Sequence, residues 1–119
     1  LVEAERAARA LDAGLCIFCK SGKDRTGMSA TLAEAMVLQE DRALDDSRPA
    51  EAVANDDATL DLANLMREYG VRLRVCEKNV GRKKYAFNII QRKFLPVPYR
   101  PPMASIEDLT SSIIHRDLT

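Results

Sequence analysis

An apolar run, a polar loop and a helical pattern follow one another within residues 15–39, and this order constrains the fold more than any other feature. Residues 15–18 contain β-branched and aromatic side chains and follow Gly14, which predicts a buried strand. Residues 20–26 are polar and predict a loop, after which apolar side chains recur at helical spacing to about residue 39. The sequence therefore predicts a strand, loop and helix of the α/β class.

The polar loop spaces a cysteine and an arginine with five residues between them. Backbone N–H groups on such a turn form an anion-binding nest, and the following helix adds the positive end of its dipole. This field favours Cys19 as a thiolate nucleophile, while Arg25 can bind two phosphate oxygens. We therefore expect a cysteine-dependent phosphatase that works through a phosphocysteine without metal. The expected substrate-binding residues are Lys20, Ser21, Gly22, Lys23 and Thr26.

Asp24 lies inside this loop and has two interpretations. It is the candidate general acid and base, or it accepts a hydrogen bond from Thr26 or from a backbone amide. For Cys19 and Arg25 the alternative is a buried thiol and a solvated arginine. A nucleotide-binding loop does not fit, because Ile17 stands where its first glycine is required and Asp24 stands where its hydroxyl is required.

Two lysines within the loop, Lys20 and Lys23, indicate a substrate with more negative charge than a single phosphate monoester. That reading predicts a polyphosphorylated headgroup, and the alternative is that both are solvated loop lysines. The absence of His before the nucleophile, where Phe18 stands, argues against a protein tyrosine phosphatase.

The pattern Cys-Lys-Ser-x-Lys-Asp-Arg-Thr over residues 19–26 resembles that of inositol polyphosphate 4-phosphatases and related bacterial effector phosphatases. Residues 82–88, continued by Gln91 and residues 96–102, are similar to the carboxyl-terminal stretch of the same 4-phosphatases. The resemblance implies a cysteine-phosphatase-like α/β fold and hydrolysis of the 4-phosphate of phosphatidylinositol 3,4-bisphosphate. It also implies that residues 1–119 are the carboxyl-terminal part of one phosphatase domain, truncated at its amino-terminal side and mostly helical. A membrane-binding region and the first half of the domain are expected upstream.

Charge is segregated along the chain although the formal net charge is zero. Residues 40–68 hold nine acidic and three basic residues, whereas residues 72–100 hold nine basic residues and only one acidic residue, Glu77. The charge pattern indicates either a dipolar solvated surface or a basic face for an anionic partner. Residues 82–84 are either the solvated start of a helix or a contact with anionic lipid. Three cysteines without a zinc-binding pattern indicate a reducing compartment. We expect a cytoplasmic protein, peripheral at endosomal or plasma membranes, with a phosphoinositide headgroup as partner, no nucleic acid and no cofactor.

The remaining pattern predicts four further helices and one strand. A first helix is expected to end near Ala13, a helical turn to lie at residues 50–54, and a helix to run over residues 60–69 up to Gly70. Alternation of Val71, Leu73 and Val75 with arginines predicts a short strand. A helix is expected from residue 85 to 94, extended chain at 99–102, and a weak helix at 105–118.

Overall fold

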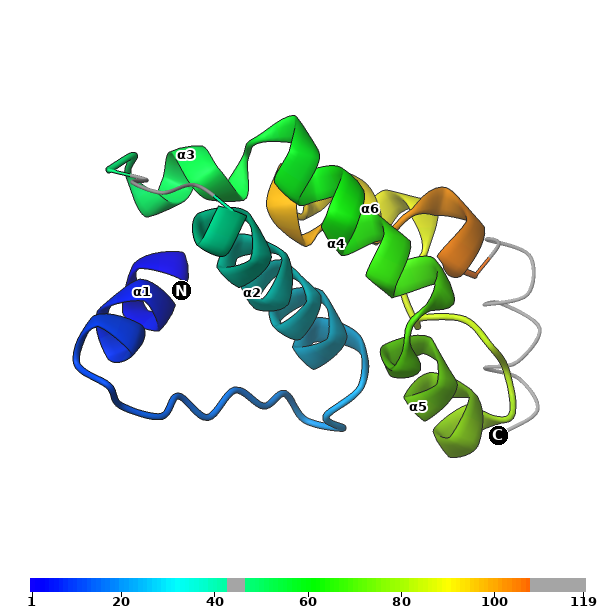
Figure 1. Ribbon diagram of the computed structural model, residues 1–119. Coiled ribbons are helices and arrows are strands. Elements are labelled where there is room, and N and C mark those ends of the chain that lie inside the picture. The colour runs from blue at the N-terminus through cyan, green and yellow to red at the C-terminus, as the bar shows by residue number, and fades with distance from the viewer. Residues whose placement is uncertain (43–46, 108–119) are drawn as a thin grey trace.

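The computed structural model describes residues 1–42 and 47–107, and within these ranges the chain is mostly helical, with no strand. Six α-helices follow in order (Figure 1), and they are α1 (Val2–Ala10), α2 (Asp24–Arg42), α3 (Ala50–Ala54), α4 (Asp57–Tyr69), α5 (Val71–Val80) and α6 (Ile89–Phe94). Two 3₁₀ turns follow them within the described residues, η1 (Val97–Tyr99) and η2 (Met103–Ser105). The helices predicted around residues 26–39, 50–54 and 60–69 are confirmed.

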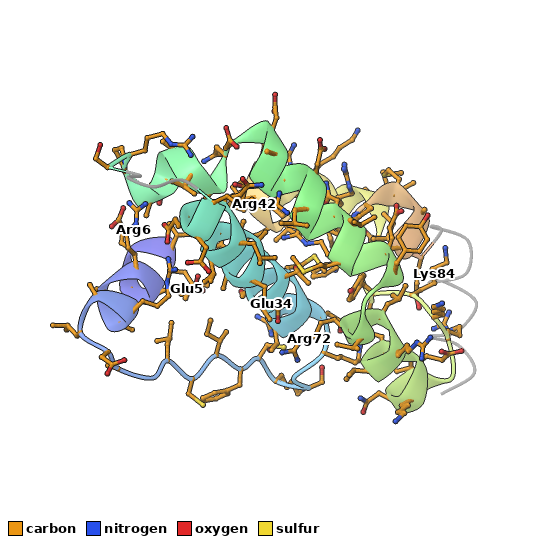
Figure 2. All side chains as sticks on the ribbon, in the orientation of Figure 1. Glu5, Arg6, Glu34, Arg42, Arg72 and Lys84 are labelled. Atoms are coloured by element: carbon orange, nitrogen blue, oxygen red, sulfur yellow. The ribbon has the colours of Figure 1, made fainter. Side chains whose placement is uncertain are left out.

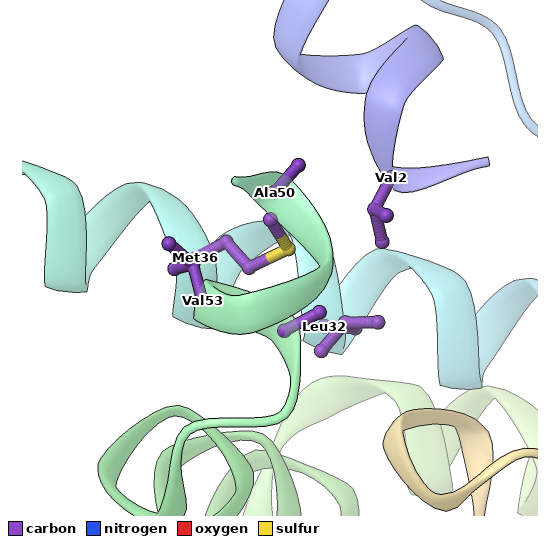
Figure 3. Close-up of a cluster of buried hydrophobic side chains, with 6 residues drawn as sticks. Val2, Leu32, Met36, Ala50 and Val53 are labelled. Atoms are coloured by element: carbon purple, nitrogen blue, oxygen red, sulfur yellow. The ribbon is translucent and has the colours of Figure 1, made fainter. Parts of the chain in front are cut away.

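The central element is α2, which packs mainly against α4 and also contacts α3, α5 and η1. One apolar cluster gathers Val2, Leu32, Met36, Ala50, Val53 and Ala54, so that α3 lies over the second half of α2 (Figure 3). A second cluster surrounds the first turns of α2 and consists of Met28, Leu73, Cys76, Tyr85, Phe87 and Ile106. The amino-terminal half of α2 is therefore fixed by α5 and by residues far along the chain.

A buried arginine on α4 connects the elements around α2. The Arg67 side chain is fully buried, and its guanidinium donates to the Thr31 hydroxyl at 2.9 Å and to the Met28 carbonyl at 3.1 Å. It also donates to the carbonyls of Pro98 at 2.7 Å and Arg100 at 3.1 Å. Burial lowers the Arg67 pKa to about 10. This single side chain therefore joins α2, α4 and the segment at η1.

The first helix, α1, is shorter than predicted. Asp12 takes a left-handed conformation with a φ of 52°, which Asp tolerates better than most residues, and the helix has already ended at Ala10. Arg6, labelled in Figure 2, pairs with Glu40 at 2.9 Å, and Arg9 pairs with the same carboxylate. These contacts hold α1 against the carboxyl end of α2.

The predicted strand at residues 15–18 does not form in the described residues. The segment runs as a connection from α1 to α2 without a sheet partner (Figure 1). A strand is stabilised by hydrogen bonds to a neighbouring strand, and none of the described segments offers one. The sheet expected of the α/β class is thus absent from residues 1–42 and 47–107.

The prediction of a strand at Val71–Val75 is wrong, because this segment begins α5. Leu73 and Cys76, three residues apart, are the buried positions, which is the spacing of a helical face. Gly70 ends α4 and caps α5, and Gly81 closes α5 with a φ of 72°, in the left-handed region that favours glycine. The alternation of Val71, Leu73 and Val75 fits a strand over this short length, and it therefore led to the wrong prediction.

The carboxyl-terminal helix is also shorter than predicted. Asn88 and Gln91 form a reciprocal capping box, so α6 begins at Ile89 and not near Tyr85. Tyr85 is instead buried in an isolated bridge with Ile106. A last helix was predicted over residues 105–118. Ser105 ends η2, and residues 108–119 lie outside the described residues. None of the described helices is long and apolar enough to span a bilayer.

Candidate active site

The loop of residues 19–23 leads into the amino terminus of α2. Gly22 has a φ of 65°, and its N–H donates to the Cys19 carbonyl at 3.3 Å, which curls the loop. Because α2 begins at Asp24 and is 19 residues long, its unpaired first N–H groups and its dipole face this loop. The turn has the form of an anion-binding site.

Cys19 is held by Thr26, one turn into α2. The Cys19 N–H donates to the Thr26 hydroxyl oxygen at 2.9 Å, and that hydroxyl donates to the Cys19 sulfur at 3.2 Å. Partial burial raises the Cys19 pKa, but the Thr26 hydroxyl and the N–H groups of Thr26, Gly22 and Ser21 outweigh it and lower the pKa to about 6. At neutral pH the thiol is therefore largely a thiolate, the nucleophilic form.

Arg25 is exposed and lines two adjoining cavities beside the loop. The smaller cavity, of about 280 Å³, is also lined by Asp24, Ala86, Phe87, Gln91 and Leu95. The larger, of about 510 Å³, is mainly apolar and extends past Met28 to η1 and the amino terminus of α1. Since Arg25 belongs to both cavities, a ligand in either one would adjoin its side chain.

Asp24 has partners on both carboxylate oxygens. Its Oδ1 accepts from the Ala86 N–H at 2.8 Å and lies 3.8 Å from the Cys76 sulfur, while Oδ2 contacts the Lys23 ammonium. Of the two interpretations of Asp24, the geometry favours the acceptor of a backbone amide. The amide comes from a segment 62 residues downstream.

The two loop lysines lie in different surroundings. Lys23 is buried and is paired with Asp24, whereas Lys20 is exposed. Ser21 is exposed too, and its N–H is among the groups that lower the Cys19 pKa. The structure thus brings Cys19, Ser21, Gly22 and Thr26 together around the sulfur. It pairs Lys23 with Asp24 and leaves Lys20 facing solvent.

Sequence reasoning missed the residues that support the loop from outside it. Cys76 of α5 is fully buried, and burial together with the charge of Asp24 raises its pKa to about 11. A Cβ built at Gly27 would lie 3.2 Å from the Tyr85 ring and 3.8 Å from Cβ of Arg72, which Figure 2 labels beside the start of α2. The resemblance of residues 82–88 was the one signal that pointed to this region.

Metal ligands do not gather in the part of the chain that the structure describes, where no three His, Cys, Asp or Glu side chains meet as a metal site requires. The candidate site consists of a thiol, hydrogen-bond donors and cations. Such a set suits attack on an anionic phosphate ester.

Comparison with known proteins gives one family. The family model described as the INPP4A C-terminal domain matches residues 1–99. The chain is 37% identical over 84 residues to inositol polyphosphate 4-phosphatase type II of Homo sapiens. The same identity holds for the type II inositol 3,4-bisphosphate 4-phosphatase of Pongo abelii, and 36% for that of Rattus norvegicus. Each match covers 71% of this chain and 8% of the relative.

No solved structure matches the chain. The chain thus corresponds to a small part of these long relatives, and the match to the family model extends over most of its residues. On that match, the chain belongs to the inositol polyphosphate 4-phosphatase family, within the family's C-terminal domain.

Proposed function

We propose that the chain carries the nucleophile and phosphate-binding loop of a phosphoinositide phosphatase that removes the 4-phosphate of phosphatidylinositol 3,4-bisphosphate. The observation that carries the proposal is the Cys19 thiol, which has a pKa of about 6 at the amino terminus of α2. The names of the relatives, which are 4-phosphatases of inositol phosphates, support the choice of substrate and of position.

In the first step the Cys19 thiolate attacks phosphorus, and the bond between phosphorus and the inositol oxygen breaks. The phosphoryl group becomes bonded to sulfur, and the leaving alkoxide takes a proton. The N–H groups of the loop and the Arg25 guanidinium stabilise the charge on the phosphoryl oxygens in the transition state. The thiolate acts directly, so this step requires no metal.

In the second step water attacks the phosphocysteine, inorganic phosphate leaves, and the Cys19 thiolate is restored. Thr26 already donates to this sulfur at 3.2 Å, so its hydroxyl is placed to stabilise the departing thiolate. Asp24 remains the candidate proton donor of the first step, although its contacts with Ala86, Cys76 and Lys23 favour a role in positioning the loop.

The proposal includes the cysteine-phosphatase-like fold of the complete domain. Residues 15–18 end at the nucleophile and precede α2, which is where such a fold places a strand. Their apolar side chains include Leu15 and Phe18, which are 45% and 83% exposed. We propose that upstream parts of the domain supply the neighbouring strands and cover these side chains.

We propose that an enzyme acting on this substrate works in the cytoplasm, peripherally at endosomal or plasma membranes. Exposed Lys20 supports binding of a multiply charged headgroup. Lys23 also binds the headgroup if a headgroup phosphate replaces Asp24 as the partner of its ammonium. The basic residues of 72–100 support attraction to an anionic lipid surface.

Phosphate release tests the proposal. The chain is incubated with a soluble dioctanoyl phosphatidylinositol 3,4-bisphosphate beside its Cys19→Ser variant, and inorganic phosphate is measured by malachite green. Release by the wild type alone is the expected result, and equal release by both would refute catalysis by Cys19. Two alternatives have their own outcomes. Faster hydrolysis of phosphopeptides indicates a dual-specificity protein phosphatase, and headgroup binding without release indicates a non-catalytic binding module.

A further inference from the structure

The surface around α6 combines exposed apolar side chains with a long segment that lacks acidic residues. Phe94 is 85% exposed and Ile90 is 54% exposed. They lie four residues apart in α6 and therefore on one side of the helix, where they form what is called here the α6 ridge. A phenylalanine this exposed is unusual for a surface that meets only water.

The α6 ridge adjoins the cavity beside the phosphate-binding loop. Gln91 within α6 and Leu95 directly after it line that cavity together with Arg25. Gln91 follows the ridge residue Ile90, and Leu95 follows the ridge residue Phe94. The side of α6 that lines the cavity is therefore adjacent to the side that carries the ridge. A molecule that enters the cavity from this edge passes the ridge.

The stretch of sequence that contains α6 carries charge of one sign, and Glu107 just beyond it pairs with Arg82. Residues 78–106 contain no Asp or Glu, and their basic residues are Lys78, Arg82, Lys83, Lys84, Arg92, Lys93 and Arg100. Lys93 is exposed next to Phe94. Apolar side chains inserted among cations are the composition with which peripheral proteins bind anionic lipid surfaces. This complementarity favours a membrane over a protein partner.

We propose that the α6 ridge inserts into an anionic lipid surface and so presents the cavity beside Arg25 to headgroups that are still attached to the membrane. The inference rests on the proposed function for its substrate. Its physical reason is that a loop can reach the phosphate of a membrane lipid only when the rim of its cavity contacts the bilayer.

Vesicle binding tests the ridge without the reaction. The probe is a vesicle of phosphatidylcholine with about one third phosphatidylserine, which carries no phosphoinositide, and binding is measured by co-sedimentation. We expect Phe94→Ser to weaken binding about tenfold and Ile90→Ser about threefold, because less apolar surface leaves water. Tyr69→Ser and Leu65→Ser are the matched controls, since these residues on α4 are 76% and 57% exposed.

A fluorescence measurement reports insertion directly, because the sequence contains no tryptophan. Phe94→Trp should show blue-shifted emission on addition of the vesicles, whereas Tyr69→Trp should not. The inference is overturned if Phe94→Ser binds vesicles as the wild type does, or if Tyr69→Ser loses as much affinity. It is also overturned if the ridge holds together a dimer that Phe94→Ser dissociates, or if Phe94→Trp emission does not shift.

The two proposals fail separately. Phosphate release from water-soluble inositol 3,4-bisphosphate needs no lipid surface, so Phe94→Ser should leave its rate unchanged, and a slower rate would assign Phe94 to the cavity and overturn the ridge. Cys19→Ser should bind the vesicles as the wild type does. Vesicle binding with no phosphate release on any substrate leaves the ridge standing and refutes the catalytic proposal.

Discussion

Replacing Thr26 with valine removes one hydroxyl that makes two contacts with Cys19. The hydroxyl accepts from the Cys19 N–H at 2.9 Å and donates to the sulfur at 3.2 Å. Valine has the shape of threonine, so the buried position stays filled and the change acts on hydrogen bonding. Thr26→Ser is the matched control, because serine keeps the hydroxyl.

The size of the effect follows from one charged hydrogen bond. A hydrogen bond to an ionised group contributes about 1.5–3 kcal/mol, which corresponds to about 1–2 pKa units. The backbone N–H groups of Ser21, Gly22 and Thr26 remain as donors in the variant. The Cys19 pKa should therefore rise from about 6 to about 7–8 in Thr26→Val and stay near 6 in Thr26→Ser.

Alkylation by iodoacetamide as a function of pH measures this pKa. Exposed Cys16 would react as well, so the experiment uses a Cys16→Ser background, in which Cys76 is fully buried. The pH at the midpoint of the rate profile gives the Cys19 pKa. The maximal rate at high pH is not used, because the nucleophilicity of a thiolate also changes with its pKa. At pH 6 the Thr26→Val variant should react about tenfold more slowly.

The reasoning is refuted if the midpoint of Thr26→Val coincides with that of the wild type, since the hydroxyl would then contribute nothing to thiolate stability. A midpoint shifted equally in Thr26→Ser and Thr26→Val would also refute it. In that case the loop responds to any change at this position.

Three further predictions concern the same loop and its supports. Folding lowers the Cys19 pKa, so the Cys19 thiolate stabilises the folded state. This stabilisation is complete above the unfolded pKa of about 8.5 and is lost as pH falls through the folded pKa of about 6. The difference in unfolding free energy between wild type and Cys19→Ser should follow this course in urea titrations at pH 5–9. Asp24→Asn should slow release of phosphate equally for good and poor leaving groups if Asp24 positions the loop, whereas a selective loss with poor leaving groups would identify it as the proton donor. Arg67→Ala should lower the free energy of unfolding by about 3–5 kcal/mol, because it removes five hydrogen bonds of a buried side chain, among them those to the carbonyls of Pro98 and Arg100. Exposed Arg74→Ala should change it by less than about 0.5 kcal/mol, and a small effect of Arg67→Ala in the same titration would contradict the role of this side chain.

Local patterns were sufficient for the elements that bury a regular face. Met28, Leu32, Ala35 and Met36 are all buried along α2, so their spacing in the sequence predicted the helix correctly. The positive φ at Gly22 is likewise local in origin, because glycine adopts the left-handed region without strain.

The wrong strand in α5 has a different cause. Val71 is 73% exposed although it is apolar, whereas Cys76 is fully buried. The prediction assumed that apolar residues are buried, so it took Val71 as a buried position and overlooked Cys76. The helix depends on the caps at Gly70 and Gly81 and on packing against α2, which only the tertiary structure supplies.

The supports of the candidate site could not be predicted, because their partners lie far apart in the sequence. Arg67 stands in an acidic stretch and resembles a solvated surface residue. Apart from Asn64 on its own helix, however, its acceptors lie 31–39 residues away and are brought together by folding. Only the identity of the loop residues themselves was accessible from spacing.

The hydrogen bond between Asp24 and the Ala86 amide makes the nucleophile loop and the carboxyl-terminal segment parts of one equilibrium. Linkage is reciprocal, so an anion that orders the loop must stabilise residues 85–87 by the same free energy that this segment contributes to anion affinity. Protection of the Ala86 amide against hydrogen exchange is therefore a remote measure of how well the loop holds phosphate. Sequence changes near Ala86 should therefore alter how tightly the loop holds phosphate, through this hydrogen bond as well as through the cavity wall.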